Sequence, residues 1–456
     1  MAEATTRARH ATRESKQAPP RETFRRASLA VLALLCAGGA ACGSGDRPAQ
    51  TAPSERVVLI VIDTLRRDFL SSYGSEVATP NIDALAARGQ RFSDYTAAFH
   101  QTSMSMGALF TGRTPSLEFN RIERTLFWNS ASWCGLNRFA KDRDETLCIP
   151  PSVPTLAESI RDAGYWTIGV ASNQFLYEPS SFSRGFDDWN EVGKKPETMG
   201  ALARFKLPDA SATRFFGHVN EAALAAVDRR KSDRFFLYVH YMDVHDYGGR
   251  GAQRYAKAVG SVDWAVGKLL GELEARALMD DTRVILTADH GERLGERHAI
   301  RGKPGHTGNP SFREVLAVPL VIAPPIDRDP EAFLRTQDLF YVIQEAVGIE
   351  TAPESSLEPD ELFLTETDYR TYQRGRWKSS LRRDDGSFLL FDLDADPGES
   401  SNVADAHPEV VAEHRRRMDE IAEAVSARRA VVERLSEEDR ERLRELGYLE
   451  QLENPR

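Results

Sequence analysis

The chain has 456 residues, of which 41% are hydrophobic and 28% charged, as in a folded protein that buries a large core. Its 59 basic and 69 acidic residues give a formal net charge of −10 at pH 7. General nucleic-acid binders contact phosphates through basic surfaces, so this acidic balance argues against that class and predicts no nucleic-acid partner.

The first 42 residues differ from the rest in composition. A basic stretch, "RETFRRA", precedes the uncharged run "SLAVLALLCAGGAAC", which is shorter than the about 20 apolar residues of a membrane-spanning helix. This order is typical of an export signal. "GGAAC" is similar to a lipobox, so residues 1–42 are predicted to be a lipoprotein-type signal. Cys42 would then carry the lipid that attaches the exported protein to a membrane, in the periplasm or at the cell surface. Ordinary secretion, with cleavage nearby, is the alternative.

Residues 43–56, "GSGDRPAQTAPSER", are small and polar and predict a linker. Over residues 57–354, continuous apolar runs alternate with stretches whose apolar positions have helical spacing. The apolar runs, predicted as buried strands, include "VVLIVID", "RFFLYVHYMD", "TRVILTAD" and "VLAVPLVIAPP"; the helical stretches include "TPNIDALAARG" and "YAKAVGSVDWAVGKLLGELEARAL". The alternation predicts an α/β fold, a doubly wound and mostly parallel sheet with helices on both faces.

The pattern changes after about residue 355. "YRTYQRGRWKSSLRRDDGSFLLFDLDADPGE" alternates polar and apolar residues around turn signals, which is typical of a small antiparallel sheet. "SEEDRERLRELGYLE" is a charged helical stretch near the end of the chain. Residues 355–456 are therefore predicted to form a smaller C-terminal α+β domain.

The chain has four cysteines. Cys36 lies in the predicted signal and Cys42 would be acylated, which leaves Cys134 and Cys148. In an oxidising compartment these two are predicted to form a disulfide, which would stabilise the fold by about 3 kcal/mol through loop closure. Two separate buried thiols are the alternative.

Three predicted strands end in residues that bind metals. Asp63 ends the first, Asp243 and His245 follow another, and Asp289 and His290 follow a third. Taken singly, such an aspartate often caps a helix and such a histidine is often a solvated loop residue. Ligands of parallel sheets bind at the carboxyl ends of the strands, so the coincidence of these residues there indicates a divalent-metal site. Hard oxygen ligands with imidazole suit Mn²⁺, Zn²⁺, Mg²⁺ or Ca²⁺.

Thr102 stands just ahead of a predicted helix, in "HQTSMSMGALFTGRTPS". A hydroxyl there lies in the positive field of the helix N-terminus, beside free backbone N–H groups that suit an anion. Coordination to a metal would make the hydroxyl a nucleophile. The alternative is that Thr102 only caps the helix.

Five stretches in the same order resemble the sulfatase family of the alkaline-phosphatase superfamily, from about residue 56 to the C-terminal region. They are "VVLIVIDTLRRDFLSSYG…TPNIDALAARG", "TSMSMGALFTGRTPS", "FFLYVHYMDVHD", "VDWAVGKLLGELEARALMDDTRVILTADHGERLGE" and "LLFDLDADPGESSNVADAHPEVV". The resemblance implies a doubly wound α/β fold with a small C-terminal domain. It also implies hydrolysis or transfer of a sulfate or phosphate ester at a divalent metal.

The resemblance assigns the metal ligands residue by residue. Asp63 matches the metal-binding aspartate after the first strand, and Thr64 stands where the family has a second aspartate. Asp289 and His290 match the later metal pair, which is Asp-Asn in typical sulfatases. Thr102 falls at the position of the nucleophile and would complete the metal site.

The resemblance also implies residues that contact the substrate anion. His245 matches the histidine of the family's "MDPHDP"-like loop, and His306 approximates a further anion-binding position, with Lys303 and Arg301 near it and His298 as a competitor. His245 and His306 would stabilise the anion or protonate the leaving group.

The chain departs from the family at the nucleophile motif. Sulfatases carry C/S-x-P-x-R, whose first residue is oxidised to formylglycine, whereas residues 102–106 read "TSMSM". No formylglycine is therefore expected. A Thr nucleophile with an Asp, Asp, His metal shell is similar to the phosphotransferase and phosphodiesterase branch of the superfamily. A second metal would need residues such as Asp243, His245 and His306, so one metal ion is predicted.

These features predict a metal-dependent hydrolase that acts on a small anionic ester of sulfuric or phosphoric acid. One alternative is a transferase that moves a phospho-headgroup onto an envelope acceptor; such enzymes commonly carry several membrane spans, which the sequence does not show. The other is a catalytically silent, anion-binding protein that retained the fold.

Overall fold

The computed structural model describes the chain from residue 53 to residue 425 with gaps. The described residues are 53–115, 134, 136, 148–178, 180–193, 216–247, 251–300, 304–306, 310–353, 357–366 and 368–425. The predicted export signal, Cys42, Arg301, Lys303 and the charged helix near the C-terminus lie outside these residues.

A seven-stranded sheet forms the centre of the α/β part. Five neighbouring strands are parallel. The next strand runs antiparallel to them, and the strand at that edge runs antiparallel to it in turn. In spatial order the strands are β2 (Gln90–Arg91), β8 (Leu320–Ala323), β7 (Thr282–Thr287), β1 (Arg56–Ile62), β6 (Phe235–Tyr241), β4 (Trp166–Ala171) and β5 (Asp188–Glu191). The predicted doubly wound, mostly parallel sheet is confirmed. Strands β1, β6 and β7 are mostly apolar and are buried along almost their whole length, because both faces of this sheet are covered.

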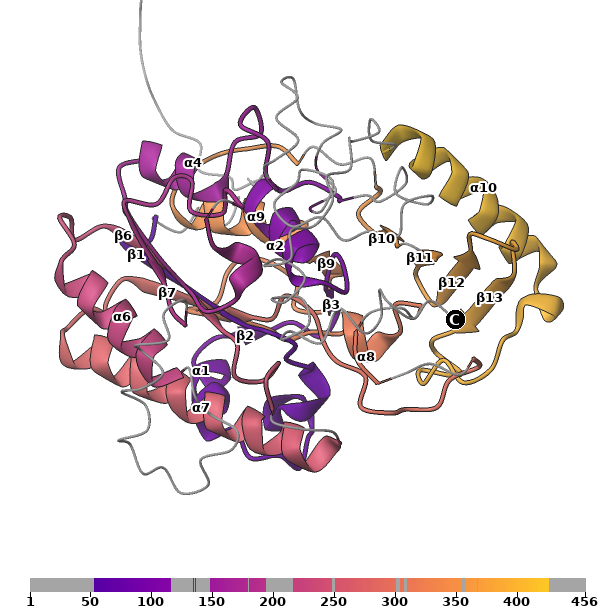
Figure 1. The fold of residues 1–456 in the computed structure, drawn as a ribbon, viewed down its shortest axis with the longest axis horizontal. Coiled ribbons are helices and arrows are strands. Elements are labelled where there is room, and N and C mark those ends of the chain that lie inside the picture. The colour runs from indigo at the N-terminus through magenta and orange to yellow at the C-terminus, as the bar shows by residue number, and fades with distance from the viewer. Residues whose placement is uncertain are drawn as a thin grey trace, which may run out of the picture. The chain divides into compact units, whose positions relative to one another are not determined.

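Helices cover both faces of the sheet (Figure 1). On one face lie α2 (Thr102–Thr111), α4 (Leu156–Asp162) and α9 (Thr336–Ala346); on the other lie α1 (Pro80–Ala87), α6 (Phe216–Asp228) and α7 (Ala252–Ala275). The connecting elements are η1 (Arg67–Phe69), η2 (Ser71–Tyr73), η5 (Gln174–Leu176), α8 (Arg313–Leu316) and the pair β3 (Tyr95–Thr96) and β9 (Leu334–Arg335). Among the described residues, no helix has both the length and the apolar character needed to cross a bilayer.

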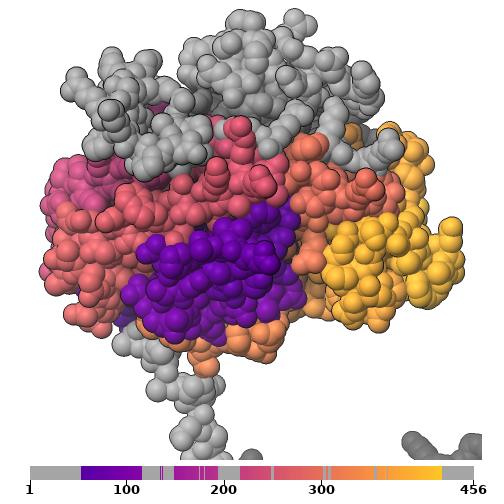
Figure 2. Space-filling view, turned by 90° about the horizontal axis from the view of Figure 1, so that it is seen from below, coloured from indigo at the N-terminus to yellow at the C-terminus, as the bar shows by residue number. Residues whose placement is uncertain are grey.

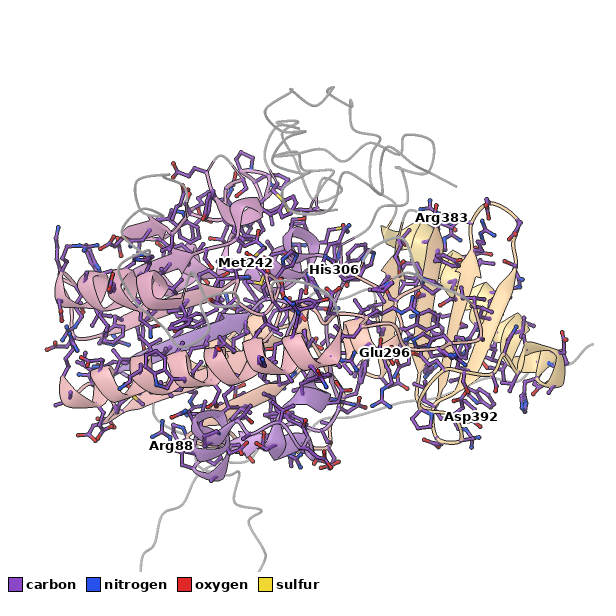
Figure 3. All side chains as sticks on the ribbon, turned by 60° about the horizontal axis from the view of Figure 1, so that its bottom comes forward. Arg88, Met242, Glu296, His306, Arg383 and Asp392 are labelled. Atoms are coloured by element: carbon purple, nitrogen blue, oxygen red, sulfur yellow. A yellow bond between two sulfur atoms is a disulfide. The ribbon has the colours of Figure 1, made fainter. Side chains whose placement is uncertain are left out.

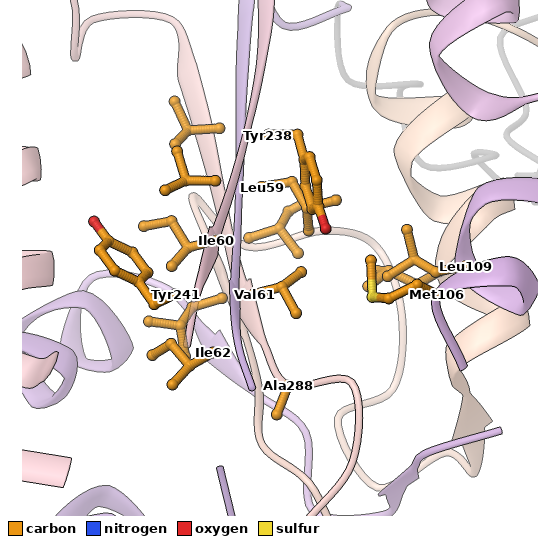
Figure 4. Packing of buried hydrophobic residues seen from close by; sticks show 14 of the residues in the cluster. Leu59, Ile60, Val61, Ile62, Met106, Leu109, Tyr238, Tyr241 and Ala288 are labelled. Atoms are coloured by element: carbon orange, nitrogen blue, oxygen red, sulfur yellow. The ribbon is translucent and has the colours of Figure 1, made fainter. Parts of the chain in front are cut away.

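Strand alternation decides which side chains of β1 and β6 reach the α2 face. Leu59, Val61 and Tyr238 point toward α2, whereas Ile60, Ile62 and Tyr241 point to the opposite face (Figure 4). Successive side chains of a strand alternate between faces, so the next positions on the α2 side are Asp63 and His240. Val61 and His240 are register partners in the parallel pair, which brings the two polar side chains close together at one edge of the sheet.

The C-terminal domain is a four-stranded antiparallel sheet with a helix packed on it, as predicted. A separate cluster of buried residues, among them Phe363, Tyr372, Met418 and Ile421, joins the helix to the sheet. The elements are β10 (Glu361–Thr365), β11 (Tyr369–Arg374), β12 (Trp377–Arg382), β13 (Phe388–Asp392), η6 (Ala404–Ala406) and α10 (Pro408–Val425).

The predicted disulfide is present between Cys134 and Cys148, whose Cα atoms are 5.1 Å apart. Cys134 Sγ lies 3.3 Å from the carbonyl oxygen of Ser103 in the first turn of α2. A Cβ added at Gly107, one turn further along α2, would lie 3.6 Å from Cys134 Cβ. The disulfide therefore packs directly against the helix that begins with Thr102.

A buried aspartate of α7 stabilises the start of α1, which packs beside it (Figure 2, indigo beside pink). Asp263 Oδ1 accepts hydrogen bonds from the backbone N–H groups of Asn81 at 3.1 Å and Ile82 at 2.8 Å. Its Oδ2 accepts from Asn81 Nδ2 at 2.8 Å. The first N–H groups of a helix lack partners within it, so Asp263 serves as the cap that Thr79, the residue before α1, does not supply.

We expect Asp263→Ala to lower the free energy of unfolding by about 1–3 kcal/mol, because it leaves two buried N–H groups without an acceptor. Urea denaturation followed by circular dichroism measures this change. Asp233→Ala, which removes an 85% exposed carboxylate paired with Arg230 at 3.4 Å, is the control and should change stability by less than about 0.5 kcal/mol. Equal stabilities of the two variants would contradict the capping role.

Candidate active site

Two buried carboxylates lie at the ends of neighbouring parallel strands. Asp63 follows β1 and Asp289 follows β7, and neither side chain is exposed to solvent. Asp63 Oδ1 and Asp289 Oδ2 are buried and have no hydrogen-bond partner among the described residues. A buried charge without partners costs several kcal/mol or more, so a cation bound between these two oxygens would be strongly favoured.

The remaining oxygen of each carboxylate is fully engaged. Asp289 Oδ1 accepts from the backbone N–H groups of Thr64, at 3.1 Å, and His290, at 2.8 Å. Asp63 Oδ2 is within hydrogen-bond distance of three side chains described below. Neither aspartate caps a helix: the first helical turn after Asp63 begins only at Arg67, and Asp289 binds the loop that follows β1. The carboxylates are therefore fixed so that only their unpartnered oxygens remain to bind an ion.

Two imidazoles complete a set of ligands suited to a divalent metal. Asp63, His240 and Asp289 each offer one ligand atom, and these three atoms lie within 4.8 Å of one another. His290 Nδ1 lies 3.0 Å from the carbonyl oxygen of Gly291, so Nδ1 carries the proton and Nε2 has a free lone pair. That Nε2 lies 3.5 Å from Asp289 Oδ2. Carboxylate and imidazole together suit a borderline or hard divalent ion.

Thr102 presents its hydroxyl to this pair of carboxylates. It is the first residue of α2 rather than the residue just ahead of the helix, as the sequence predicted, and Gln101 occupies the N-cap position. Thr102 Oγ1 lies 3.3 Å from Asp63 Oδ2 and 3.4 Å from His290 Nε2, with the residue only 1% exposed. Its hydroxyl thus contacts the ligand set rather than capping the helix.

Two side chains from neighbouring strands, Asn173 after β4 and His240 in β6, hydrogen-bond to Asp63 and fix its orientation. Asn173, which follows β4, donates from Nδ2 to Asp63 Oδ2 at 2.6 Å and to Thr102 Oγ1 at 3.2 Å. His240 Nε2 lies 3.1 Å from Asp63 Oδ2, and its Nδ1 lies 2.8 Å from the hydroxyl of Tyr238. The orientation of Asp63 is therefore set by β4 and β6 as well as by β1.

A further histidine, His306, lies against His290, in the part of the α/β region that faces the C-terminal sheet (Figure 3). The ring of His306 is 4.5 Å from that of His290 and 5.5 Å from that of His245, measured between centroids. Glu292 Oε2 lies 2.6 Å from His306 Nδ1. His306 therefore pairs with a carboxylate on one side and faces the two other imidazoles.

Burial and mutual charge shift the carboxyl groups in opposite directions. Burial tends to raise the pKa of Asp63, but the hydrogen bond with His240 and the charges of His245 and His290 hold it well below its ordinary value. Burial and the charge of Asp63 raise the pKa of Asp289. Burial also raises the pKa of Glu292 to about 7. Two carboxylates this close disfavour each other's ionised form, which a bound cation would relieve.

The structure brings together most of the residues expected at the site from the sequence and separates others. Asp63, Thr102, Asp289 and His290 are in mutual contact, and His245 and His306 lie beside them. Asp243 instead accepts the N–H of Phe216, the first residue of α6, at 3.0 Å.

His298 lies at the junction with the C-terminal domain. Its Nδ1 is 3.0 Å from the carbonyl oxygen of Gly398, its Nε2 is 3.2 Å from Glu314 Oε2, and its ring stacks on Phe312 at 3.8 Å. His298 therefore packs at this junction, and the histidine beside His290 is His306. Arg301 and Lys303 lie outside the described residues.

Sequence reasoning missed three residues of the site: Asn173, His240 and Glu292. His240 lies inside an apolar strand, and only its spacing of two from Tyr238 could have indicated its face. Asn173 is the second residue after β4, and Asp289 likewise is the second residue after β7. Glu292 stands two residues after His290, in a stretch already rich in ligands.

The fold and the site define an α/β protein that gathers carboxylates, imidazoles and a helix-start hydroxyl at the carboxyl ends of its parallel strands. Residues 55–349 match the model of the sulfatase family, and the chain belongs to that family. It is accordingly a sulfatase-like ester hydrolase.

Relatives and solved structures agree with this assignment. The chain is 23% identical to an N-acetylgalactosamine-6-O-sulfatase of Bacteroides thetaiotaomicron, over 83% of this chain and 94% of the relative. Its fold matches that of a 2-O GAG sulfatase with a TM-score of 0.64 and 17% identity, over 82% and 92% of the two chains. It also matches the phosphonate monoester hydrolase of Agrobacterium radiobacter, with a TM-score of 0.59 and 17% identity, over 85% and 99%.

Asp289→Asn should stabilise the metal-free protein, by roughly 1 kcal/mol, because it removes one of two buried like charges while the amide oxygen keeps both backbone hydrogen bonds. With a divalent ion present the order should reverse, since only the wild type binds the ion tightly. Differential scanning calorimetry in EDTA and in excess Mn²⁺ measures both effects. The metal site would be contradicted if Mn²⁺ raised the melting temperatures of the two proteins equally.

Proposed function

We propose that the protein hydrolyses a small ester of sulfuric or phosphoric acid at one divalent metal ion, with Thr102 as nucleophile and without formylglycine. The observation that carries this proposal is the position of the Thr102 hydroxyl. It lies at the start of α2, against Asp63 and His290, beside two buried carboxylate oxygens that lack partners.

The metal would be held by Asp63, Asp289, His290 and Thr102, with His240 in reach of the same position. A Mn²⁺, Zn²⁺, Mg²⁺ or Ca²⁺ ion bound there would act as a Lewis acid on the anionic ester and favour the deprotonated hydroxyl. The unpartnered oxygens of the two aspartates supply the negative charge that such an ion requires.

The chain's own groups account for the remaining chemistry. Thr102 Oγ1 attacks the sulfur or phosphorus atom, its proton directed at Asp63 Oδ2, and the bond to the leaving oxygen breaks as the new bond forms. The free N–H groups at the start of α2 stabilise the negative charge of the anion. His306 or His245 donates a proton to the leaving oxygen. Water then attacks the covalent ester on Thr102 and regenerates the hydroxyl.

The composition of α2 supports a threonine rather than a formylglycine nucleophile. Residues 102–106 read "TSMSM", and the Ser105 hydroxyl is engaged with the carbonyl oxygen of Asp289 at 2.5 Å. Ser103 is buried on the same turn. Thr102 is thus the side chain of this turn whose hydroxyl contacts both Asp63 and His290.

The class of substrate that we propose is based on the esters that similar proteins hydrolyse. Similar proteins include a sugar sulfatase and a phosphonate monoester hydrolase, so a sulfated sugar and a phosphoric ester are both suitable candidates. Arg301 and Lys303 would bind the anion. Lipidation at Cys42 would keep the exported enzyme at a membrane. Transfer to an acceptor hydroxyl differs only in the last step, where the acceptor replaces water.

Thr102→Ala should reduce turnover by on the order of 10³-fold or more, since loss of a covalent nucleophile has effects of at least this size in enzymes that act through one. Thr102→Ser should retain measurable activity. Thr111→Ala, which removes a hydroxyl bonded to the carbonyl oxygen of Gly107 at the other end of α2, is the control. Unchanged turnover by Thr102→Ala would remove this residue from the mechanism.

Turnover of the purified protein should depend on a divalent ion and should be lost in EDTA and restored by Mn²⁺, Zn²⁺, Mg²⁺ or Ca²⁺. Initial rates on a 6-O-sulfated N-acetylhexosamine, a phosphomonoester and a phosphodiester, compared side by side, identify the preferred ester. Addition of an alcohol acceptor, with product analysis, separates hydrolysis from transfer. Full activity after complete removal of metal would contradict the proposed mechanism.

A further inference from the structure

Asn173 is a buried amide whose orientation is fixed by its neighbours. It follows β4 and its side chain is not exposed. Its Oδ1 accepts a hydrogen bond from the backbone N–H of Phe175 at 2.9 Å. The planar amide must therefore direct Nδ2, with its two hydrogens, to the opposite side. The reversed orientation would place Oδ1 against the carboxylate of Asp63 and lose the bond from Phe175.

The two hydrogens of Nδ2 face the two groups on which the proposed attack depends. Nδ2 lies 2.6 Å from Asp63 Oδ2 and 3.2 Å from Thr102 Oγ1. Hydrogen bonds to ionised acceptors are shorter and stronger than those between neutral groups. One rigid amide therefore ties a carboxylate that would hold the metal to the hydroxyl that would attack the substrate.

We infer that Asn173 sets the position and direction of the Thr102 hydroxyl for attack. The inference rests on the proposed function of Thr102. A hydroxyl has one hydrogen to donate and two lone pairs. Asn173 occupies one lone pair of Oγ1, and Asp63 Oδ2 and His290 Nε2 are the acceptors that face its hydrogen. The second lone pair is left for the metal, and the lone pair that Oγ1 gains when it gives up its proton is the one that attacks the substrate.

The hydrogen bond from Asn173 Nδ2 to Thr102 Oγ1 would also become stronger when the hydroxyl loses its proton. When Oγ1 gives up its proton it becomes an ionised acceptor, and the same N–H bond becomes charge-assisted. No rearrangement is needed, because Phe175 already holds the amide in place. Such preorganised donors are effective because they do not have to reorient during the reaction.

A purely structural role makes a different prediction. If Asn173 served only to hold the turn after β4 through Phe175, its replacement would lower stability and leave kcat per folded molecule unchanged. If it served only to orient Asp63 for the metal, excess metal would restore activity. A role in positioning Thr102 instead lowers kcat at saturating metal and saturating substrate, with little change in KM.

The experiment compares Asn173→Ala and Asn173→Asp in the full-length protein. Asn173→Asp keeps an acceptor for the N–H of Phe175 and removes both donors, so it tests the donors with the turn preserved. Asn220→Ala is the matched control: Asn220 is also buried and bonded at both ends, to the carbonyl oxygen of Ala265 at 2.9 Å and the Tyr241 hydroxyl at 2.5 Å, on the opposite face of the sheet.

Three quantities are measured for each variant. They are kcat and KM on the best ester of the panel, the Mn²⁺ affinity by isothermal titration calorimetry, and the rate at which a covalent adduct on Thr102 forms in a single turnover, by mass spectrometry. Both Asn173 variants should lose about 10- to 100-fold in kcat and in adduct formation at saturating Mn²⁺. KM should stay within about threefold, as expected when a transition-state interaction is lost. Asn220→Ala should keep the wild-type kcat per folded molecule.

Either of two results would overturn the inference: a wild-type rate of adduct formation in both Asn173 variants, or full recovery of kcat by excess Mn²⁺. The failure of the proposed function is distinguishable from both. It would appear as turnover by Thr102→Ala, with no adduct on Thr102 in the wild type.

Discussion

The structure depends on the placement of two carboxylates, those of Asp63 and Asp289, inside the protein at the ends of adjacent parallel strands. Each has one oxygen satisfied by fixed donors and one oxygen buried without a partner. Burying like charges side by side is unfavourable unless a cation lies between them. The sheet imposes this arrangement because β1 and β7 are in parallel register and end at the same edge.

The elements around this pair provide either a ligand or a restraint. Helix α2 brings Thr102 to the carboxylates. The helix is held in place by the hydrogen bond from Ser105 to the carbonyl oxygen of Asp289 and by the disulfide, which packs against its first turns.

The loop after β7 carries His290 and Glu292 and continues to His298, which contacts the C-terminal domain through Gly398. That junction also contains the buried ion pair of Lys378 and Glu399, whose charged atoms are 2.5 Å apart. Glu399 accepts in addition a hydrogen bond from the backbone N–H of Arg313 at 2.6 Å. The C-terminal domain thus supports the loop that carries His290 and Glu292.

Much of this arrangement could be predicted from the sequence, because two physical signals are strong in it. Continuous apolar runs predict strands buried on both faces, and β1, β6 and β7 each contain such a run. Parallel strands place their carboxyl ends at one edge, so the polar residues that follow β1 and β7 had to lie close together. Asp63, Asp289 and His290 meet for this reason. The helix near Thr102 was predicted from the apolar spacing after it, but its start was placed too late, since Thr102 is the first residue of α2.

The missed and misplaced residues lack such a signal. His240 is a single polar residue in the run "RFFLYVHY", and its role is visible only once Val61 is known to be its register partner. Asn173 is one polar residue among several after β4, and its contacts with Asp63 and Thr102 are long-range. His298 and His306 are close in sequence, and only the packing of the C-terminal domain separates them. Asp243 was a reasonable ligand candidate, but the start of α6 uses it as a cap.

The most direct test of the central claim is anomalous diffraction from crystals of the protein grown with Mn²⁺. The account predicts an anomalous peak within coordination distance of both Asp63 Oδ1 and Asp289 Oδ2, with an imidazole nitrogen of His290 or His240 in the same shell. Crystals saturated with Mn²⁺ that show no peak between these two carboxylates would contradict it.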